Sequence, residues 1–273
     1  MNRTSIERQT QIINCLVEGN SIRSTERITG SHRDTIMRLL VRVGNECETF
    51  LDNKMRNLNC QRIQVDEIWT YVKKKQRHVT SSDDPNHNGN MWTFVAIDAD
   101  TKLVPAYKVG KRDLYTAHKF MKDLSNRLTN RVQISSDALR AYVEATEQAF
   151  GTDVDYGQIV KSYETEPVGP GRYSPPKVVN AKKRTISGAP DDKHISTSYI
   201  ERQNLTMRMS MRRFTRLTNA FSKKVENLIA AVALHFAYYN FVRIHRSLRV
   251  TPAMEAGIES RVWDLSDLVE MAN

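Results

Sequence analysis

The hydrophobic pattern of the chain changes near residue 62. Before that point, apolar residues recur at intervals of three and four, which predicts helices over 5–18, 22–29 and 32–51. Gly-Asn-Ser at 19–21 and Gly-Ser at 30–31 interrupt this spacing and predict the turns between the helices. The second and third helices, joined by a tight turn with glycine, therefore have the pattern of a helix-turn-helix.

After residue 62, short runs of β-branched and aromatic residues alternate with helical segments, which predicts an α/β fold with a mixed sheet flanked by helices. The turn at 98–102 should make the second and third strands a hairpin. The predicted strands are 62–75, 91–100, 103–110, 131–139 and 155–164, and the predicted helices are 114–128, 140–151 and 196–214. The apolar run 228–242 contains His235 and Asn240 and is too short for a membrane span, so it is predicted to be a buried helix.

The segment 164–197 differs from its surroundings, because it holds five of the eight prolines together with Lys182, Lys183 and Arg184. It is predicted to be a long, poorly structured insertion, and loops of that length are usually functional or disordered. The predicted organisation is a small all-α DNA-binding domain at 1–53, a linker at 54–61, a catalytic domain at 62–256 with the insertion at 164–197, and a C-terminal tail at 257–273.

Charge narrows the choice of partner. The 273 residues include 41 basic and 31 acidic side chains, and the net charge of +10 favours a polyanion, nucleic acid first. The three cysteines form no metal-binding or disulfide pattern, and the N-terminus has no apolar signal segment. These features predict a cytoplasmic protein associated with DNA.

The predicted helix-turn-helix supplies a specific candidate for DNA binding. A recognition helix must present its first turn to base edges in the major groove. Polar residues occupy that turn here, while Ile36, Leu39 and Leu40 face inward; a plain three-helix bundle that binds nothing is the alternative. The residues expected to contact DNA are Ser31, His32, Arg33, Thr35 and Arg38, and Arg42 is also placed to reach a phosphate.

Three carboxylates are the candidates for catalysis. Asp66 lies within the first strand, Asp137 ends the strand at 131–139, and Glu201 lies on the helix at 196–214. Ligands bind at strand carboxyl ends in open α/β sheets. Carboxylates gathered there repel one another unless cations hold them, and two Mg²⁺ or Mn²⁺ ions about 3.5–4 Å apart suit an in-line attack at phosphorus.

The same helix carries arginines at helical intervals after Glu201. Ile200, Met207, Met211 and Phe214 are predicted to form its apolar stripe, with Glu201, Arg208, Arg212 and Arg216 on a neighbouring face. Salt bridges on a surface helix are one interpretation. The other is that the arginines hold DNA phosphates against a metal site completed by Glu201.

Other interpretations of these acids remain open. Glu67 competes with Asp66 if the strand register shifts by one residue. Asp137 has the right place to cap the helix that follows it. Asp98 and Asp100 are better explained by turn chemistry. The polar loop contains a candidate metal cluster, or only turn residues: His78, Asp83, Asp84 and His87. Another group either borders the active site or only packs a helix end: Tyr239, Asn240, Arg243 and His245.

Four ordered motifs resemble the DDE transposases of bacterial insertion sequences, which have an RNase-H-like catalytic domain, and are closest to the insertion-sequence-one family. They are VDEIWTYV, ISSDAL, YIERQNLTMRMSMRRFTR, and YYNFVRIHRSL followed by TPAMEAG, and together they cover about residues 62–256. The zinc-binding cysteine cluster of some relatives is absent from this sequence.

The resemblance implies that Asp66, Asp137 and Glu201 are metal ligands for two Mg²⁺ or Mn²⁺ ions. It implies hydrolysis at the ends of a mobile element and attack of the freed 3′-OH on target DNA. The partners implied are double-stranded DNA and further copies of the chain, as a homodimer or larger assembly on DNA; neither a membrane nor a nucleotide cofactor is expected. Residues expected to bind DNA here are Lys182, Lys183, Arg184, Asn204, Arg208 and Arg212.

Two other functions fit parts of the sequence. One is a transcriptional regulator that keeps the helix-turn-helix and uses its second domain only to dimerise. The other is a nuclease or resolvase of the same fold that cuts DNA without joining strands. The three acids disfavour the first, and only an assay of strand joining separates the second from a transposase.

Overall fold

The computed structural model describes residues 4–164, 177–216 and 218–273. Its main elements in chain order are α1 (Ile6–Val17), α2 (Ile22–Thr29), α3 (Arg33–Lys54), β1 (Arg62–Val72), β2 (Gly89–Asp98), β3 (Tyr107–Gly110), α4 (Leu114–Ser125), β4 (Val132–Asp137), α5 (Arg140–Phe150), β5 (Val154–Glu164), β6 (Lys177–Ser187), α6 (Ser198–Ser210), α7 (Val225–Ala237), the π-helical turn Tyr238–Val242, α8 (Pro252–Glu255) and α9 (Leu265–Glu270).

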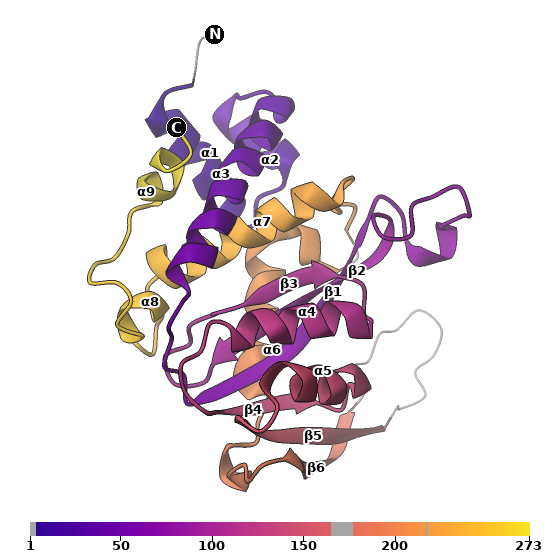
Figure 1. Ribbon diagram of the computed structural model, residues 1–273. Helices are drawn as coiled ribbons and strands as arrows, with labels where there is room; N and C mark the ends of the chain where they lie inside the picture. Colours follow the sequence, from indigo (N-terminus) through magenta and orange to yellow (C-terminus); the bar gives the residue numbers. More distant parts are fainter. Residues whose placement is uncertain (1–3, 165–176, 217) are drawn as a thin grey trace.

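A mixed sheet lies at the centre, with the strand order β3-β2-β1-β4-β5-β6. Strand β4 pairs in parallel with both β1 and β5, whereas β1–β2, β2–β3 and β5–β6 are antiparallel. Helices α4 and α5 cover one face of the sheet, and α6 lies behind the other (Figure 1). The predicted α/β fold class, a mixed sheet flanked by helices, is confirmed, as is the β2–β3 hairpin.

Strand β1 shows how the sequence places helices on both faces. The side-chain Oε1 of Gln64 accepts hydrogen bonds from the backbone N–H of Tyr199 (2.8 Å) and of Ile200 (3.2 Å), at the start of α6. Three residues later, Glu67 accepts one from the hydroxyl of Tyr142 on α5. Because successive side chains of a strand alternate between faces, the odd spacing sends these two side chains to opposite layers.

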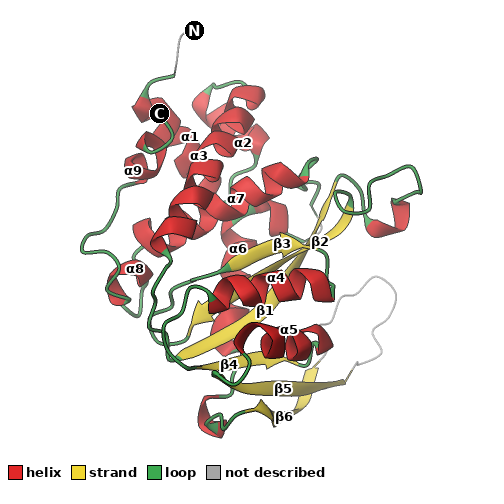
Figure 2. Cartoon of the chain, in the orientation of Figure 1, coloured by secondary structure: helices red, strands yellow, loops and turns green. Residues whose placement is uncertain are grey.

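Helix α3 packs on α7 above the sheet, and α1 and α2 pack on α3 (Figure 2). Leu228 and Phe236 of α7 are fully buried, which confirms the predicted buried helix at 228–242. Gly44 of α3 permits a close approach, because a Cβ there would lie 2.2 Å from the carbonyl oxygen of Ala230. Across the described ranges, no helix combines the length and apolar character needed to cross a membrane.

The segment 257–273, predicted as a tail, contains α9 with Leu268 and Val269 fully buried. Helix α9 packs beside α1, so helices from the two halves of the sequence lie side by side in Figure 1. The side-chain amide of Gln9 on α1 donates a hydrogen bond to Asn273 at 3.3 Å. Residues from both ends of the sequence thus contribute to the same helical layer.

The predicted loop insertion at 164–197 is wrong for residues 177–187, which form the edge strand β6. Val160 of β5 pairs with Lys182, and Gln158 pairs with Arg184. The strand was missed because most of its side chains are exposed, so it lacks the apolar alternation by which a half-buried strand is identified. Residues 165–176 of the same prediction lie outside the described residues.

The helix predicted at 196–214 ends earlier, at Ser210. Met211 has an extended backbone (φ −119°, ψ 106°), and Arg212 begins a short 3₁₀ turn. Met211 and Phe214 are nevertheless buried, as their apolar spacing indicated. Glu201, Arg208, Arg212 and Arg216 therefore do not share one helical face, and that prediction is corrected.

Candidate active site

The register of β1 and β4 brings two of the predicted acids together. Val65 pairs with Ser136 in the parallel ladder, so Asp66 and Asp137 each follow the last paired residue. One carboxylate oxygen from each of Asp66, Glu67 and Asp137 lies within 4.8 Å of the others. Within the described residues this is the group of acids arranged to hold a metal ion, and it lies at the carboxyl end of β4, where α/β sheets bind ligands.

Asp66 is held from two sides. Its Oδ1 accepts the backbone N–H of Glu67 at 2.8 Å, and its Oδ2 accepts the side-chain amide of Asn204 at 2.9 Å. Burial raises the pKa of Asp66 to about 7, and the negative charges of Glu67, Asp137 and Glu201 add to the effect. In the unfolded chain the Asp66 carboxyl has a pKa near 3.8, below its value in the folded protein. Its ionisation therefore makes the cation-free protein less stable as pH rises from about 4 to 7. A bound cation removes that penalty.

Glu67 belongs to the acid cluster, but both of its oxygens are already engaged. Its Oε1 accepts Arg112 at 2.6 Å, and its Oε2 accepts the hydroxyl of the buried Tyr142 at 3.1 Å. Burial is the main cause that raises the pKa of Glu67, with Asp137 adding to it and Arg112 opposing it. Binding a metal would require Glu67 to give up a charge-assisted hydrogen bond in a buried place, which is costly. Asp66 and Asp137 are therefore the better ligands.

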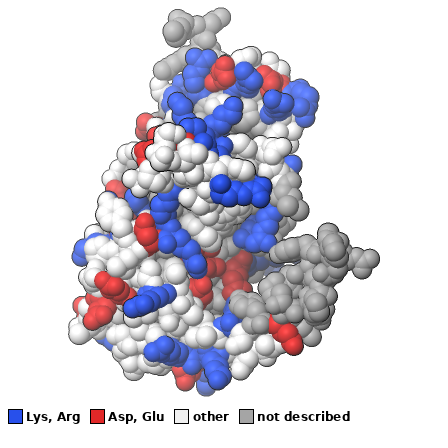
Figure 3. Space-filling model, turned by 90° about the vertical axis from the view of Figure 1, so that its right-hand side faces the viewer, with Lys and Arg blue, Asp and Glu red and all other residues white. Residues whose placement is uncertain are grey.

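Glu201 lines the same pocket without reaching the cluster. Its carboxylate accepts a hydrogen bond from the Thr197 hydroxyl at 2.6 Å and forms an ion pair with Lys161 of β5. The pocket has a volume of about 650 Å³, and Asp66, Asp137 and Glu201 all line it. Figure 3 shows acidic side chains gathered in a hollow on this side of the molecule, with lysine and arginine around them.

The donor atoms fit a divalent cation such as Mg²⁺ or Mn²⁺. Those ions prefer carboxylate and amide oxygens, which are what the pocket offers. Asn204 supplies an independent observation: its Oδ1 is buried beside Asp66 and has no hydrogen-bond partner among the described residues. A metal-bound water or the ion itself would satisfy that oxygen.

Asp137 does not cap α5 directly, since the N-cap residue is Leu139. The Asp137 Oδ1 instead accepts the Leu139 backbone N–H at 3.0 Å, two residues ahead. This short turn fixes the carboxylate at the mouth of the pocket and leaves its other oxygen for a ligand. The capping interpretation is thus replaced by a turn that orients Asp137.

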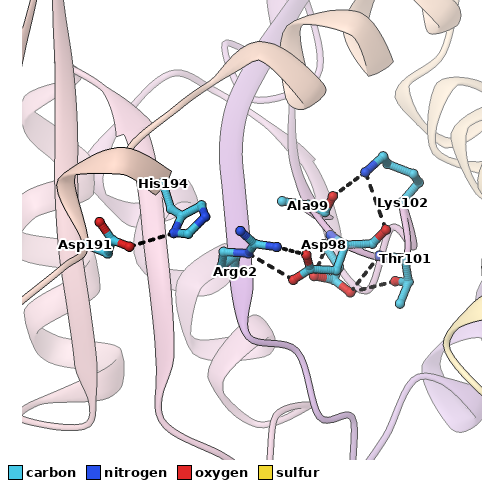
Figure 4. A network of polar contacts seen from close by, with 8 residues as sticks. Arg62, Asp98, Ala99, Thr101, Lys102, Asp191 and His194 are labelled. Atoms are coloured by element: carbon cyan, nitrogen blue, oxygen red, sulfur yellow. Dashed lines mark hydrogen bonds and ion pairs between the residues drawn. The ribbon is translucent and has the colours of Figure 1, made fainter.

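The other acidic candidates have local roles. Asp83 forms ion pairs with Lys73 and Lys74, and Asp84 pairs with His87, so the loop at 78–87 supplies no metal cluster among the described residues. Figure 4 shows the turn after β2, in which Asp98 accepts the Thr101 hydroxyl at 2.6 Å. Asp100 there pairs with Arg62. The turn interpretation of Asp98 and Asp100 holds.

The residues predicted to read DNA lie in the turn before α3 and in the first turns of that helix. His32 caps the helix by accepting the Asp34 backbone N–H at 3.3 Å, and the Arg38 guanidinium donates to the Asp34 carbonyl oxygen at 3.2 Å. Ile36, Leu39 and Leu40 face inward as expected. His32, Arg33 and Arg38 are exposed, and Ser31 and Thr35 are half-buried. Arg42 instead donates to Gln9 on α1 at 2.5 Å.

The remaining predicted DNA contacts fall in different places. Lys182, Lys183 and Arg184 are exposed on β6, and Arg212 is exposed beyond the end of α6. Arg208 is half-buried on α6. Asn204 is only 5% exposed, and its amide contacts Asp66, so it lies inside the acid site, and its contact with DNA stays a prediction.

Sequence reasoning missed four residues in and behind the pocket. Lys161, Thr197, Arg112 and Tyr142 hold Glu201 and Glu67 in place, yet none stands in a recognisable motif. Lys161 gave no signal of its own, because β5 also contains Asp155, Gln158, Ser162 and Glu164. Its partner could not be inferred, because the contact depends on how α6 lies across the sheet.

Comparisons with known proteins add little to this geometry. No family model matches the sequence, and no curated protein matches it. The piggyBac transposase synaptic complex with hairpin DNA aligns with 99% of this chain and 71% of its own, at 10% identity and a TM-score of 0.46. The Mos1 transposase paired-end complex with the left transposon end aligns with 54% of this chain and 58% of its own, at 14% identity and a TM-score of 0.22. Both scores lie below 0.5, so the functional argument rests on the site.

Proposed function

We propose that the protein is a DDE transposase, which cuts and joins DNA at a divalent-metal site built from Asp66, Asp137 and Glu201. The observation that carries this proposal is the acid cluster of Asp66, Glu67 and Asp137, which lies where the β1–β4 pairing ends. Burial, with three neighbouring acids adding to it, raises the pKa of Asp66 to about 7. Such strongly perturbed groups in a pocket are typical of active sites.

Asp66 and Asp137 would hold the metal, and Glu201 would join them once its carboxylate leaves Lys161. Bound ions would supply charge stabilisation for the attacking and leaving oxygens of a phosphodiester. The amide of Asn204 fixes the orientation of Asp66. Lys161, freed from Glu201, would present its ammonium group to a DNA phosphate, and Arg140 at the pocket wall is placed to do the same.

Binding of the element ends is assigned to the start of α3 and the turn before it, with Ser31, His32, Arg33, Thr35 and Arg38. The tight turn supports this assignment, because Gly30 adopts a left-handed conformation (φ 64°) and ends α2 just before α3 begins. The exposed basic side chains of β6, Lys182, Lys183 and Arg184, would contact DNA beyond the acid site. A transposase must act on both ends of its element together, so a homodimer or larger assembly on DNA is part of the proposal. We also propose that the protein belongs among the transposases of bacterial insertion sequences.

The test is cleavage and strand joining by the purified protein in Mg²⁺ or Mn²⁺, on DNA carrying the sequences that flank its gene. The expected result is a cut at a defined end and a joined product in a target plasmid, both abolished by chelation of the metal. Cutting without joining would replace the transposase with a nuclease or resolvase. Sequence-specific binding with no metal-dependent chemistry would favour the regulator instead.

A further inference from the structure

Helix α6 separates the acid site from a second pocket of about 540 Å³. Tyr199, Arg202, Gln203 and Thr206 line this pocket and follow one face of α6 at intervals of three and four residues. Glu201 lines the acid site on the other side. The far wall comes from the segment 239–247, which belongs to the motif YYNFVRIHRSL that the catalytic proposal does not use.

That far wall is fixed by hydrogen bonds to the connection between β2 and β3. The hydroxyl of Tyr239 donates to the Lys102 carbonyl oxygen at 3.0 Å. The buried side chain of Asn240 bonds both the N–H and the C=O of Val104, each at 3.0 Å. Tyr239 and Asn240 therefore hold the segment in place, and the residues after them, Arg243 and His245, line the pocket instead of bordering the acid site.

The pocket gathers positive charge without a carboxylate in its lining. Arg202, Arg243 and Arg246 are exposed, and no ion pair within the described part of the chain involves any of them. Lys102 adds a fourth cation; its ammonium lies 3.7 Å from the centre of the Tyr199 ring and reaches back to the Ala99 carbonyl oxygen (Figure 4). Repulsion among clustered cations is relieved by a bound anion.

A buried amide gives an independent indication of a ligand. Gln203 is only 2% exposed, and its Nε2 has no hydrogen-bond partner among the described residues. A buried donor without an acceptor costs free energy, and an oxygen of a ligand in the pocket would satisfy it. An anion that offers several acceptor oxygens fits both the free amide and the arginines around it.

We propose that this cationic pocket, formed by Lys102, Arg202, Gln203, Arg243 and Arg246, binds a phosphodiester group of DNA at a place separate from the acid site. DNA is favoured over a small phosphate because the rim is open and apolar beside the cations, with Tyr199 43% and Ile244 55% exposed. These side chains can pack on the sugars of a strand whose phosphate enters the pocket. The choice of DNA rests on the proposed function.

The test compares DNA affinity, measured by fluorescence anisotropy of a labelled duplex without divalent metal, over a series of salt concentrations. The double variant Arg202→Gln with Arg243→Gln is expected to bind about tenfold more weakly or worse. Its slope of log affinity against log salt should fall by about 0.9, since the pocket neutralises one phosphate. The matched control, Lys108→Gln with Lys122→Gln, removes the same charge from exposed positions on β3 and α4 and should change affinity less than about twofold.

The variant Gln203→Met separates loss of the pocket from misfolding, because misfolding would lower the thermal midpoint. Removing the unpaired buried amide should raise the thermal midpoint of the free protein while weakening DNA binding. Unchanged binding by both pocket variants, or an equal loss in the lysine control, would overturn the pocket assignment. If the wild type cleaves DNA and the pocket variants bind DNA normally, the transposase proposal stands and the pocket proposal fails. If the pocket variants lose DNA binding and the wild type does not cleave DNA, the pocket proposal stands and the transposase proposal fails.

Discussion

Asp137→Asn is expected to lower the rate of metal-dependent DNA cleavage about 10³-fold or more. Charge stabilisation by a bound metal is worth several kcal/mol in the transition state, and each ~1.4 kcal/mol changes a rate tenfold. The substitution keeps the side-chain volume and an oxygen that can still accept the Leu139 backbone N–H, now 3.0 Å away. The fold should therefore survive, and the loss should come from the missing charge. The rate of nicking of a supercoiled plasmid in Mg²⁺ measures the effect.

The matched control for that variant is Glu147→Gln, which removes a carboxylate from the exposed face of α5, outside the acid site. It should cut within about twofold of the wild type, since surface charge changes away from a site have small effects. Thermal unfolding of both variants confirms that they are folded. Cleavage by Asp137→Asn at a rate within tenfold of the wild type would remove Asp137 from the metal site.

Gly44→Ala is expected to lower the free energy of unfolding by about 1–3 kcal/mol, the usual cost of overpacking. The added Cβ would lie 2.2 Å from the Ala230 carbonyl oxygen and 2.7 Å from the Ala230 Cβ, so α3 and α7 must separate. The sign of the change in unfolding free energy tests the close packing, because replacing glycine by alanine in an unconstrained helix stabilises a protein by about 1 kcal/mol. Urea unfolding followed by tryptophan fluorescence measures the change.

Asn45→Ala on the next residue of α3 is the control, since that position is exposed. It should be neutral or slightly stabilising, as alanine is the better helix former. If Gly44→Ala stabilised the protein as much as Asn45→Ala does, the close packing of α3 on α7 would be contradicted. A loss confined to Gly44→Ala would show that the N-terminal helices share a core with the rest of the chain.

The sequence predicted those parts of the fold that depend on local pattern. The apolar spacing of α3 and the strand character around Asp66 followed from periodicity, and both are present in the structure. The sequence also predicted that Asp66 and Asp137 come together, and the structure brings them together because Val65 pairs with Ser136 in the parallel ladder. Strand β6 was not predictable in this way, since an exposed edge strand has no buried face to reveal it.

The details of the site escaped prediction for a different reason. The sequence placed Glu201 with the two aspartates, whereas the structure pairs it with Lys161, a contact set by the position of α6 over β5. Glu67 was considered only as a substitute for Asp66. Its actual partners, Arg112 and Tyr142, come from two other segments, so no spacing in the sequence connects them. Tertiary contacts of this kind leave no periodic signal.

The two pockets beside α6 give the helix a double role. Its Glu201 side faces the acid site, and its Arg202 side faces the cationic pocket, so DNA bound on the second side would contact the helix that carries Glu201. Lys161 is the group that Glu201 must leave before it can bind a metal. Metal binding and DNA binding are therefore expected to act on one structural element.

The most direct test of the central claim, that Asp66, Asp137 and Glu201 form a divalent-metal site, is a crystal structure of the protein soaked in Mn²⁺ and measured for anomalous scattering. The predicted result is a peak contacted by Asp66 and Asp137, with Glu201 turned away from Lys161 toward the metal and Glu67 still bound by Arg112. A saturating soak with no peak at Asp66 and Asp137, or a peak held by Glu67 with Glu201 left on Lys161, would contradict the claim.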